Sequence, residues 1–378
     1  MKIKSILEET IAKKASDLHL KAGLPPVLRI DGRLTKLDFE KPSTKDMQDI
    51  ADQILSPAQR KRFMEMKEVD FAFGVPGLAR FRANFYVQRG SIAMVFRHVP
   101  VKILSIDELL LPEVIKKLSH HERGLIFVTG TVGSGKSTTL AAMVREINET
   151  SNKNIITIED PIEFLHHDKR SIINQREIGN DTQSFHEALR HILRQDPDVI
   201  LVGEIRDAET MEIALKAADT GHLVLSTLHT MDATQTINRV ISFFPPHQHQ
   251  EIRYLLATTL KSVISQRLIP LAEGAGRAPA VEVMVVTSTI RDYIIDPEKQ
   301  ELIKQAIKEG VSSHGMQSFD QSMMKLLTEG RISKEEALRN SSNPHEFELR
   351  LKGVQSASDK SWEHFEKAEA EGGPSREL

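Results

Sequence analysis

One stretch near the middle of the chain constrains the fold more than any other. Residues 125–128 form a short apolar run, which is typical of a buried parallel strand. The pattern G-x-x-x-x-G-K-S follows from Gly130 to Ser137, and residues 138–148 have the composition and spacing of a helix. A strand, a glycine-rich loop and a helix in this order are the setting that a phosphate-binding loop requires. The sequence therefore predicts a nucleotide-binding site here.

The residue types of this loop fit a triphosphate. Gly133 and Gly135 allow backbone conformations closed to other residues, so that successive N–H groups can point at the phosphates. The loop ends at a helix N-terminus, where unpaired N–H groups and the helix dipole favour an anion. Lys136 is expected to reach the β- and γ-phosphates, and the Ser137 hydroxyl to ligate Mg²⁺. We expect ATP and Mg²⁺ as cofactors, with the nucleotide held by Gly130, Thr131, Val132, Gly133, Ser134, Gly135, Lys136, Ser137 and Thr138.

Predicted strands and helices alternate after the residue Gly124. Strands are expected at 125–129, 155–159, 171–176, 199–204 and 223–228, with helices at 136–148, 183–194, 208–219 and 233–243. This alternation predicts an α/β domain with a largely parallel sheet, which we expect to cover residues 116–353. It should continue with a long helix from about 247 to 267, strands near 280–286 and three or four C-terminal helices.

The first hundred residues differ from the rest in charge. They contain 18 Lys and Arg against 12 Asp and Glu, a net charge of +6, whereas the remainder has 32 against 41, a net charge of −9. A helix is expected at 2–14, and one or two helices broken near Pro57 are expected over 44–67. Strands are expected near 18–20, 27–30, 33–34, 79–88 and 91–98. We therefore predict a smaller α+β domain over 1–100 and a linker over 101–115. The charge difference fits a basic domain lying against the phosphates, or a chance difference between two surfaces.

Two arginines are expected to face each other in the hairpin of strands 79–88 and 91–98. If the strands meet at a two-residue turn, Arg82 lies opposite Arg97. Like charges at this spacing cost stability unless an anion lies between them. Arg89-Gly90 is not a preferred two-residue turn, so the register stays open. Arg82 and Arg97 are candidate phosphate ligands; the alternative is that both are solvated on an exposed face.

Two carboxylates follow apolar strands of the predicted sheet. Glu204 ends the strand at 199–204, as in a Walker B element, and Glu163 follows the strand at 155–159. Ligands bind at the carboxyl ends of such strands, and ATP hydrolysis needs Mg²⁺ and a group that polarises water. We expect Glu163 and Glu204 to flank the γ-phosphate, one activating water and the other holding Mg²⁺ with Ser137, directly or through water. For Glu163 the alternative is a solvated loop acid.

Two histidines bracket the predicted strand at 223–228. Side chains alternate along a strand, so His222 and His229 are expected on opposite faces. His229, at the carboxyl end, is the better candidate to sense the γ-phosphate, and a structural role is the alternative for each. His186 and His191 have one residue too many between them for the H-E-x-x-H zinc pattern, so no zinc site is predicted there.

The composition excludes several classes of protein. Cysteine is absent, which excludes disulfides and Cys-based zinc or iron–sulfur sites. There is no apolar run of 18 residues, and the chain begins with charged residues rather than an apolar stretch, so we expect no membrane span, no signal peptide and a cytoplasmic location. No basic groove with interleaved aromatic residues is seen, so no nucleic-acid partner is expected. Residues 354–378 have few branched apolar residues and are predicted to be disordered.

Four motifs in one order resemble a known family. The segments 130–137, 158–163, 196–206 and 220–229 are similar to the Walker A, Asp box, Walker B and His box of the secretion and type IV pilus ATPases. The resemblance implies a homohexameric ring. Each subunit would pair a PAS-like N-terminal domain with a RecA-like P-loop motor domain that carries C-terminal helices, and ATP would bind between the two domains.

The same resemblance implies roles for the candidate residues. Glu163 would be the catalytic glutamate and Glu204 the Walker B carboxylate. His222 and His229 would be the His-box residues. Arg82 and Arg97 match family arginines of the N-terminal domain that approach the phosphates.

Three further segments are similar to the retraction, or twitching-motility, branch of this family. They are residues 16–20, 25–32 and 315–320. The four-cysteine zinc site and the long extra N-terminal domain of extension-type relatives are not seen. The implied function is ATP-driven pilus retraction through an inner-membrane platform protein, with the ring peripheral at the base of the pilus. Residues 289–296 match a motif tied to retraction only loosely, which leaves their role open.

Four alternatives stay open on the sequence alone. They are an accessory paralogue of the retraction branch, an extension or secretion ATPase of the same fold, a RecA-like nucleic-acid motor, and a nucleotide-binding regulator without turnover.

Overall fold

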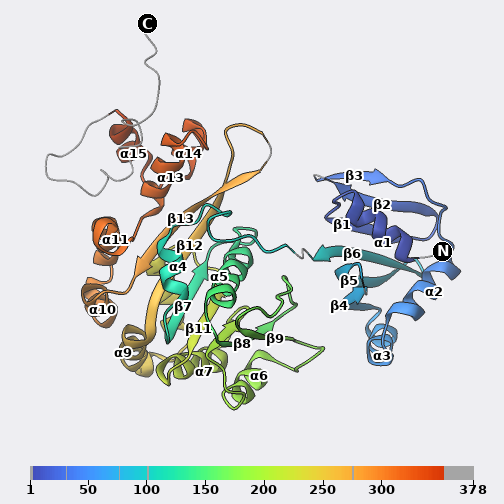
Figure 1. Cartoon of the computed structure of the whole chain (residues 1–378), viewed down its shortest axis with the longest axis horizontal. Helices are drawn as coiled ribbons and strands as arrows, with labels where there is room; N and C mark the ends of the chain where they lie inside the picture. The colour runs from blue at the N-terminus through green and yellow to red at the C-terminus, as the bar shows by residue number, and fades with distance from the viewer. Residues whose placement is uncertain (1–2, 31, 76, 100–101, 275, 353–378) are drawn as a thin grey trace, which may run out of the picture. The chain divides into compact units, whose positions relative to one another are not determined.

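The computed structural model describes residues 3–30, 32–75, 77–99, 102–274 and 276–352. The predicted disordered tail at 354–378 lies outside these ranges. The chain divides into two compact units (Figure 1). The N-terminal unit comprises Met1–Lys102 and the short segment Pro161–His166, and the C-terminal unit comprises Ile103–Asp160 and His167–Leu378.

The N-terminal unit combines one antiparallel sheet with three helices. The helices are α1 (Ile3–Ala12), α2 (Thr44–Ile54) and α3 (Pro57–Met66). The strands are β1 (Asp17–Lys21), β2 (Leu24–Ile30), β3 (Arg33–Lys36), β4 (Glu68–Val75), β5 (Ala79–Gln88) and β6 (Ser91–Val99). They pair in the order β3-β2-β1-β6-β5-β4. The break expected near Pro57 separates α2 from α3. Ser43 forms a capping box at the start of α2, and Ser56 forms one at the start of α3.

Alternation along the strands separates a core face from a polar face. In β5, Phe81, Ala83 and Phe85 are buried and belong to one core with residues of all three helices. Aromatic rings dominate this core; Phe85 meets Phe96 edge to face at 5.6 Å between ring centroids. The residues between them in sequence, including Arg82, therefore lie on the opposite face.

The hairpin of β5 and β6 has the register that places the two arginines together. Gln88 pairs with Ser91 and Arg82 with Arg97, as the two-residue turn predicts. Arg89 and Gly90 both have positive φ, 47° and 74°, which is the type I′ turn that matches the strand twist. The register prediction is thus confirmed, although Arg is an uncommon residue at the first turn position.

The C-terminal unit is built on a seven-stranded sheet. Its strands are β7 (Gly124–Thr129), β8 (Asn154–Glu159), β9 (Ile172–Glu177), β10 (Val199–Val202), β11 (Leu223–Leu228), β12 (Leu260–Pro270) and β13 (Arg277–Val285). The order is β13-β12-β7-β11-β10-β8-β9. All neighbours are parallel except β13, which runs antiparallel to β12.

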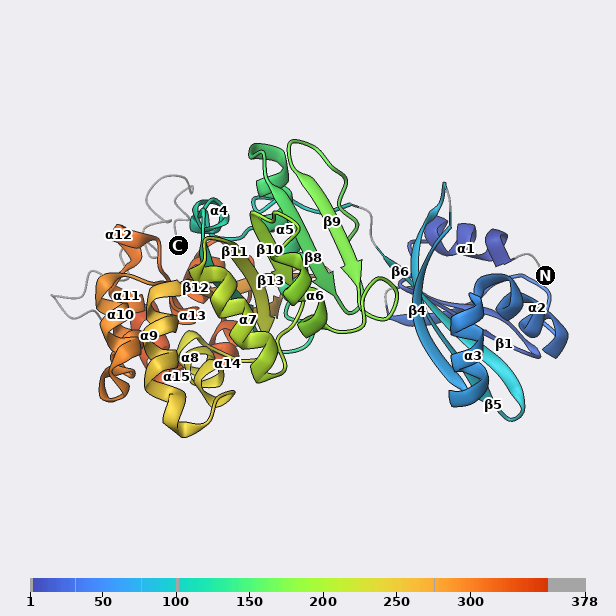
Figure 2. The same ribbon diagram turned by 90° about the horizontal axis from the view of Figure 1, so that it is seen from below.

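Helices cover both faces of this sheet, which makes it a doubly wound α/β fold. They are α4 (Val114–Ser119), α5 (Lys136–Thr150), α6 (Phe185–Ile192), α7 (Ala208–Asp219), α8 (Ala233–Ser242), η1 (Pro246–Gln248), α9 (His249–Thr259), α10 (Ser288–Ile295), η2 (Pro297–Lys299), α11 (Leu302–Glu309), α12 (Val311–His314), α13 (Phe319–Thr328), α14 (Lys334–Asn340) and α15 (Pro344–Leu351). Figure 2 shows α4 and α5 on one side of the sheet and α6 and α7 on the other. Alternate β7 residues enter two separate cores, Leu125 and Phe127 on one face and Ile126 and Val128 on the other.

The C-terminal helices have a core of their own. Phe319 and Met323 of α13, Ala337 of α14 and Phe347 of α15 pack against Ile269 of β12 and nearby β13 residues. The predicted α/β fold, with a smaller α+β N-terminal domain and C-terminal helices, is confirmed. Among the described residues, no helix combines the length and the apolar character that crossing a membrane would need.

The predicted elements differ from the structure at three points. No strand is predicted at β4, and three or four C-terminal helices are predicted where the described residues form α10 to α15. The third point is the segment before β13. The long helix expected from about 247 to 267 ends at Thr259, and the chain continues as β12. Val263 and Ile264 are buried on opposite faces of the sheet, and β12 hydrogen-bonds to β7 on one side and β13 on the other. The buried apolar run at this position reads equally well as helix or strand, and pairing between strands decides it.

A buried carboxylate predicts an unusual pH dependence of stability. Burial, with the nearby charge of Asp232, raises the pKa of Glu282 on β13 to about 7. The neutral carboxyl therefore stabilises the fold fully below its unfolded pKa, and this stability is lost as pH rises through about 7. Glu282→Gln stays neutral, so it should be more stable than the parent at pH 8 by up to about 3 kcal/mol. Chemical denaturation at pH 4, 6 and 8 measures this.

The two proteins should have equal stability at pH 4, where both side chains are neutral. Glu298→Gln, at an exposed position in η2, serves as the control and should show no such divergence. A Glu282→Gln variant that is less stable than the parent at pH 8 would contradict the expectation.

Candidate phosphate site and its carboxylates

The glycine-rich loop connects β7 to α5, in the strand–loop–helix order expected from the sequence. Gly135 precedes the first residue of α5 with φ of 92°, and Gly130 has φ of 141°. A Cβ on Gly130 would overlap the carbonyl oxygen of Gln266 on β12 and the Ser134 hydroxyl. Gly130 is thus required twice, for its φ and for the close approach of β12.

The Lys136 ammonium lies against the loop. It donates to the carbonyl oxygens of Gly130 at 2.9 Å and Thr131 at 3.1 Å, and its Nζ is 3.4 Å from Nδ1 of His229. Lys136 is buried even though it carries a charge. The loop therefore presents a fixed cation beside its backbone N–H groups, which is the arrangement that binds phosphate.

Glu204 lies at the carboxyl end of β10 and meets the same histidine. Its Oε1 is 3.1 Å from Nε2 of His229, and its Oε2 accepts a hydrogen bond from Arg206 at 2.7 Å. Burial would raise the pKa of Glu204, but the hydrogen bond from Arg206 and the charges of Arg206, His229 and Lys136 lower it below its ordinary value. Glu204 is therefore ionised at neutral pH.

His229 connects these two charged groups through its two ring nitrogens. A neutral imidazole with its proton on Nε2 donates to the Glu204 carboxylate and accepts from Lys136 at Nδ1. One tautomer of His229 thus satisfies both contacts. A movement of either Lys136 or Glu204 therefore changes a contact of the His229 ring.

His222 lies at the other end of β11. Its Nδ1 is 2.9 Å from the carbonyl oxygen of Ala217 in α7. The whole of β11 separates it from His229, so within the C-terminal unit His222 is not brought to the phosphate loop. Its contact holds the α7–β11 turn, and a nucleotide-sensing role for it stays a prediction.

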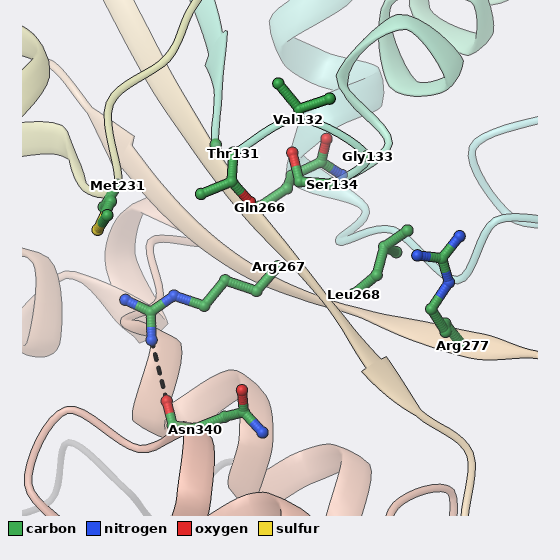
Figure 3. Close-up of a pocket in the computed structure, with 11 residues that line it drawn as sticks. Thr131, Val132, Gly133, Ser134, Met231, Gln266, Arg267, Leu268, Arg277 and Asn340 are labelled. Carbon is green, nitrogen blue, oxygen red and sulfur yellow. Dashed lines mark hydrogen bonds between the residues drawn. The ribbon is translucent and has the colours of Figure 1, made fainter.

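A cavity of about 300 Å³ opens beside the loop. One wall is the loop itself, and the other is formed by β12, β13 and α14, with Met231 at one end (Figure 3). Arg267 crosses this wall and donates to the carbonyl oxygen of Asn340 at 2.9 Å, and its guanidinium lies 4.0 Å from the centre of the Phe319 ring. The lining residues are Gly130, Thr131, Val132, Gly133, Ser134, Met231, Gln266, Arg267, Leu268, Arg277 and Asn340.

The second wall of this cavity is not predicted from the sequence. Gln266 and Arg267 fall at the end of the segment predicted as helix, and the pairing of this segment with β7 is a long-range contact. Arg277 and Asn340 come from elements still further along the chain. No local pattern marks these residues, so only the folded sheet identifies them.

The N-terminal unit holds the remaining candidates. Arg97 donates to the buried Asp17 carboxylate at 2.8 Å, and Arg82 lies 3.4 Å from Glu163 of the segment Pro161–His166. Burial would raise the pKa of Asp17, but hydrogen bonds from Arg97 and Ser16 lower it below its ordinary value. These two carboxylates offset part of the repulsion between the two arginines.

The oxygen donors in the C-terminal unit fit Mg²⁺. Ser137 begins the first turn of α5 with a half-buried hydroxyl, and Glu204 is ionised. Such hard oxygen ligands suit Mg²⁺, which is usually held by one or two protein groups plus substrate phosphates. Among the described residues there is no group of three or more His, Asp or Glu side chains that could hold a metal ion.

Comparison with known proteins decides the family. The family model described as type II/IV secretion system protein matches residues 95–339. The chain belongs to this family. Within it, the chain is 46% identical to the type IV pilus retraction ATPase PilT of Pseudomonas aeruginosa, over 92% of this chain and 100% of that protein. It is 39% identical to the type IV pilus ATPase PilU of the same organism, over 95% of this chain and 94% of PilU.

A solved structure of a type II/IV secretion system protein shares the fold along nearly the whole chain. It is a crystal structure of the pilus retraction motor PilT with bound ADP, 46% identical in sequence. The TM-score is 0.86, over 92% of this chain and 99% of that chain.

Gly130→Ala should weaken nucleotide binding. The added Cβ meets the backbone of β12, so the loop must move away from the position that cradles phosphate. We expect at least about a tenfold weaker affinity for a fluorescent ATP analogue, a loss of about 1.4 kcal/mol or more. Gly179→Ala is the control, because Gly179 also has a positive φ, 84°, but lies outside the phosphate loop with open space around it. An affinity of Gly130→Ala equal to that of the control and the parent would contradict the expectation.

Proposed function

We propose that this chain is the ATP-hydrolysing motor of type IV pilus retraction. The observation that carries the proposal is the 46% identity to the retraction ATPase PilT over the full length of that relative. The phosphate loop with its fixed lysine and the ionised carboxylate beside it supply the chemistry that such an enzyme needs. An accessory motor of the PilU type is the second candidate, supported by the lower identity of 39%.

ATP is the proposed substrate of the phosphate loop. Backbone N–H groups from Gly130 to Thr138 would bind its phosphates, and Lys136 would leave the loop carbonyls to reach the β- and γ-phosphates. The cavity wall of β12 and β13 would take the nucleoside, with Leu268 as an apolar surface and Arg277 as a cation.

The roles of the two carboxylates are assigned from the surroundings of Glu204. A general base must accept a proton from water, and a carboxylate whose pKa is lowered is a poorer base. Glu204, which is stabilised as a carboxylate by Arg206, is therefore better suited to hold Mg²⁺ with Ser137. We assign activation of water to Glu163, which would also offer an oxygen to the metal. Mg²⁺, when bound, would neutralise charge at the phosphates.

The histidine and arginine candidates are proposed to respond to the nucleotide. His229 contacts both Lys136 and Glu204, so it would register the arrival and loss of the γ-phosphate at either group. Arg82 and Arg97 would stabilise negative charge on the phosphates, exchanging their present carboxylate partners for the nucleotide. Arg82 would thereby release Glu163 for catalysis.

The assembly and the partner are also proposals. We propose that six copies form a ring that works on a platform protein of the pilus machine, peripherally at the cytoplasmic side of the inner membrane. The relation to a retraction motor supports this, and neither DNA nor RNA is a proposed partner.

Glu163→Gln and Glu204→Gln should separate binding from hydrolysis. Each removes a carboxylate charge and keeps the side-chain size, so we expect kcat to fall by about a hundredfold or more while ATP still binds. Phosphate release by the assembled protein measures kcat, and a fluorescent ATP analogue measures binding. Glu209→Gln, at an exposed position in α7, is the control and should match the parent. Hydrolysis that survives both changes would refute the assigned roles.

Deletion of the gene tests the direction of pilus movement. A retraction motor disassembles pili, so a deletion strain should show surplus surface pili and no twitching. The parent gene should restore twitching, and the Lys136→Ala gene should not, because its product lacks the cation for phosphate. Electron microscopy and a surface-motility assay provide the measurements. A strain without pili would point instead to an extension motor.

A further inference from the structure

Glu282 is a buried acid that no step of the proposed hydrolysis uses. It lies in the middle of β13 with 8% of its surface exposed. Its Oε1 accepts a hydrogen bond at 2.9 Å from the backbone N–H of Ala233, the first residue of α8. A side chain from the sheet thus occupies one of the unpaired N–H groups at the start of this helix.

Charged groups surround Glu282 from three elements. Asp232, which caps α8, is a like charge, while Arg267 of β12 and Lys304 of α11 are opposite charges. Burial outweighs the two cations, and the pKa of Glu282 rises to about 7. The carboxyl therefore changes its charge within the physiological range, at a cost in stability that a neutral side chain would avoid.

The helix α8, which Glu282 contacts at its first residue, follows His229 closely in the chain. Three residues, 230–232, separate His229 from α8. The Thr230 and Thr236 hydroxyls are 2.6 Å apart, and the Thr236 hydroxyl donates to the carbonyl oxygen of Asp232 at 2.8 Å. The segment is thus fastened to the first turn of α8, and a shift of this turn moves His229 relative to Glu204 and Lys136.

We propose that Glu282 is a positioning residue for hydrolysis, whose ionised carboxylate anchors α8 and thereby holds His229 between Glu204 and Lys136. The inference rests on the proposed ATPase function and adds to it a residue that touches neither nucleotide nor metal ligand. An ionised carboxylate makes a stronger hydrogen bond to an N–H group than a neutral carboxyl does, and the helix dipole adds to the attraction. Protonation of Glu282 therefore loosens the anchor without breaking the fold.

The test compares ATP hydrolysis by the full-length assembled protein at pH 6 and pH 8. Glu282→Gln keeps an acceptor oxygen for Ala233 but remains neutral, so it imitates the protonated parent. We expect equal kcat for parent and variant at pH 6, and a kcat about fivefold lower for the variant at pH 8. KM for ATP should change less than about twofold, because the phosphate loop is untouched.

Stability and kcat of Glu282→Gln together distinguish a positioning role of Glu282 from a purely structural one. At pH 8 the variant is expected to be more stable and yet slower than the parent. A merely structural glutamate would give a variant that is less stable and slower by the same factor at both pH values. Glu298→Gln is the control and should follow the parent at both.

A second variant removes the donor instead of the acceptor. Ala233→Pro lacks the N–H that Glu282 accepts, and proline is tolerated at the first position of a helix after an extended residue such as Asp232. Ala233→Pro should lower kcat at pH 8 by about the same factor as Glu282→Gln, although Glu282 itself is unchanged. This variant also tests the proposal if Glu282→Gln fails to fold.

The outcomes distinguish this inference from the function on which it rests. If the parent does not hydrolyse ATP, or if Lys136→Ala still does, the proposed function fails. If hydrolysis depends on Lys136 and the ratio of parent to Glu282→Gln is the same at pH 6 and pH 8, the function stands and the role of Glu282 is refuted.

Discussion

Parallel backbone pairing of β7, β11 and β10 is the constraint on which the rest of the site depends. These three strands are neighbours and end at the same edge of the sheet. Lys136 follows β7, Glu204 follows β10 and His229 follows β11, so residues almost a hundred positions apart come within hydrogen-bonding distance. The apolar residues of the strands, buried on both faces, fix the register and hence the position of each charged group.

In the N-terminal unit, two arginines lie next to each other on neighbouring strands. Register pairs Arg82 with Arg97 on one side and Asp17 with Arg97 on the other, so three charged residues form a row across β1, β6 and β5. Asp17 is buried and ionised because Arg97 is present, and Glu163 approaches Arg82. The repulsion between the two neighbouring arginines is offset because Asp17 contacts Arg97 and Glu163 contacts Arg82.

The β12–β13 hairpin joins the phosphate loop to the C-terminal helices. Its backbone approaches Gly130, and Arg267 reaches the α14 carbonyl of Asn340 and the Phe319 ring of α13. Glu282 of the same hairpin holds the first turn of α8. This pair of strands thus contacts the phosphate loop, the first turn of α8 and the C-terminal helices α13 and α14.

Much of this protein could be predicted from short-range patterns. The glycine pattern from Gly130 to Ser137 predicted the strand before it and the helix after it. The apolar run before Glu204 predicted a strand that ends near this carboxylate. A two-residue turn at Arg89-Gly90 was one possibility that the sequence left open, and the structure has the pairing of Arg82 with Arg97 that this turn implies. These predictions succeeded because each depends on residues close together in sequence, where periodicity and backbone conformation decide the outcome.

What the sequence by itself determined is the chemistry: a phosphate loop, two acids, histidines at strand ends and a separate basic domain. What only the tertiary structure decided is the set of partners. β12 was expected to be helix, since its apolar run fits both states, and its pairing with β7 and β13 overrides the local preference. The cavity wall of Gln266, Leu268 and Arg277, the partners of Arg97 and the burial of Glu282 all follow from such long-range pairing, which leaves no local signal in the chain.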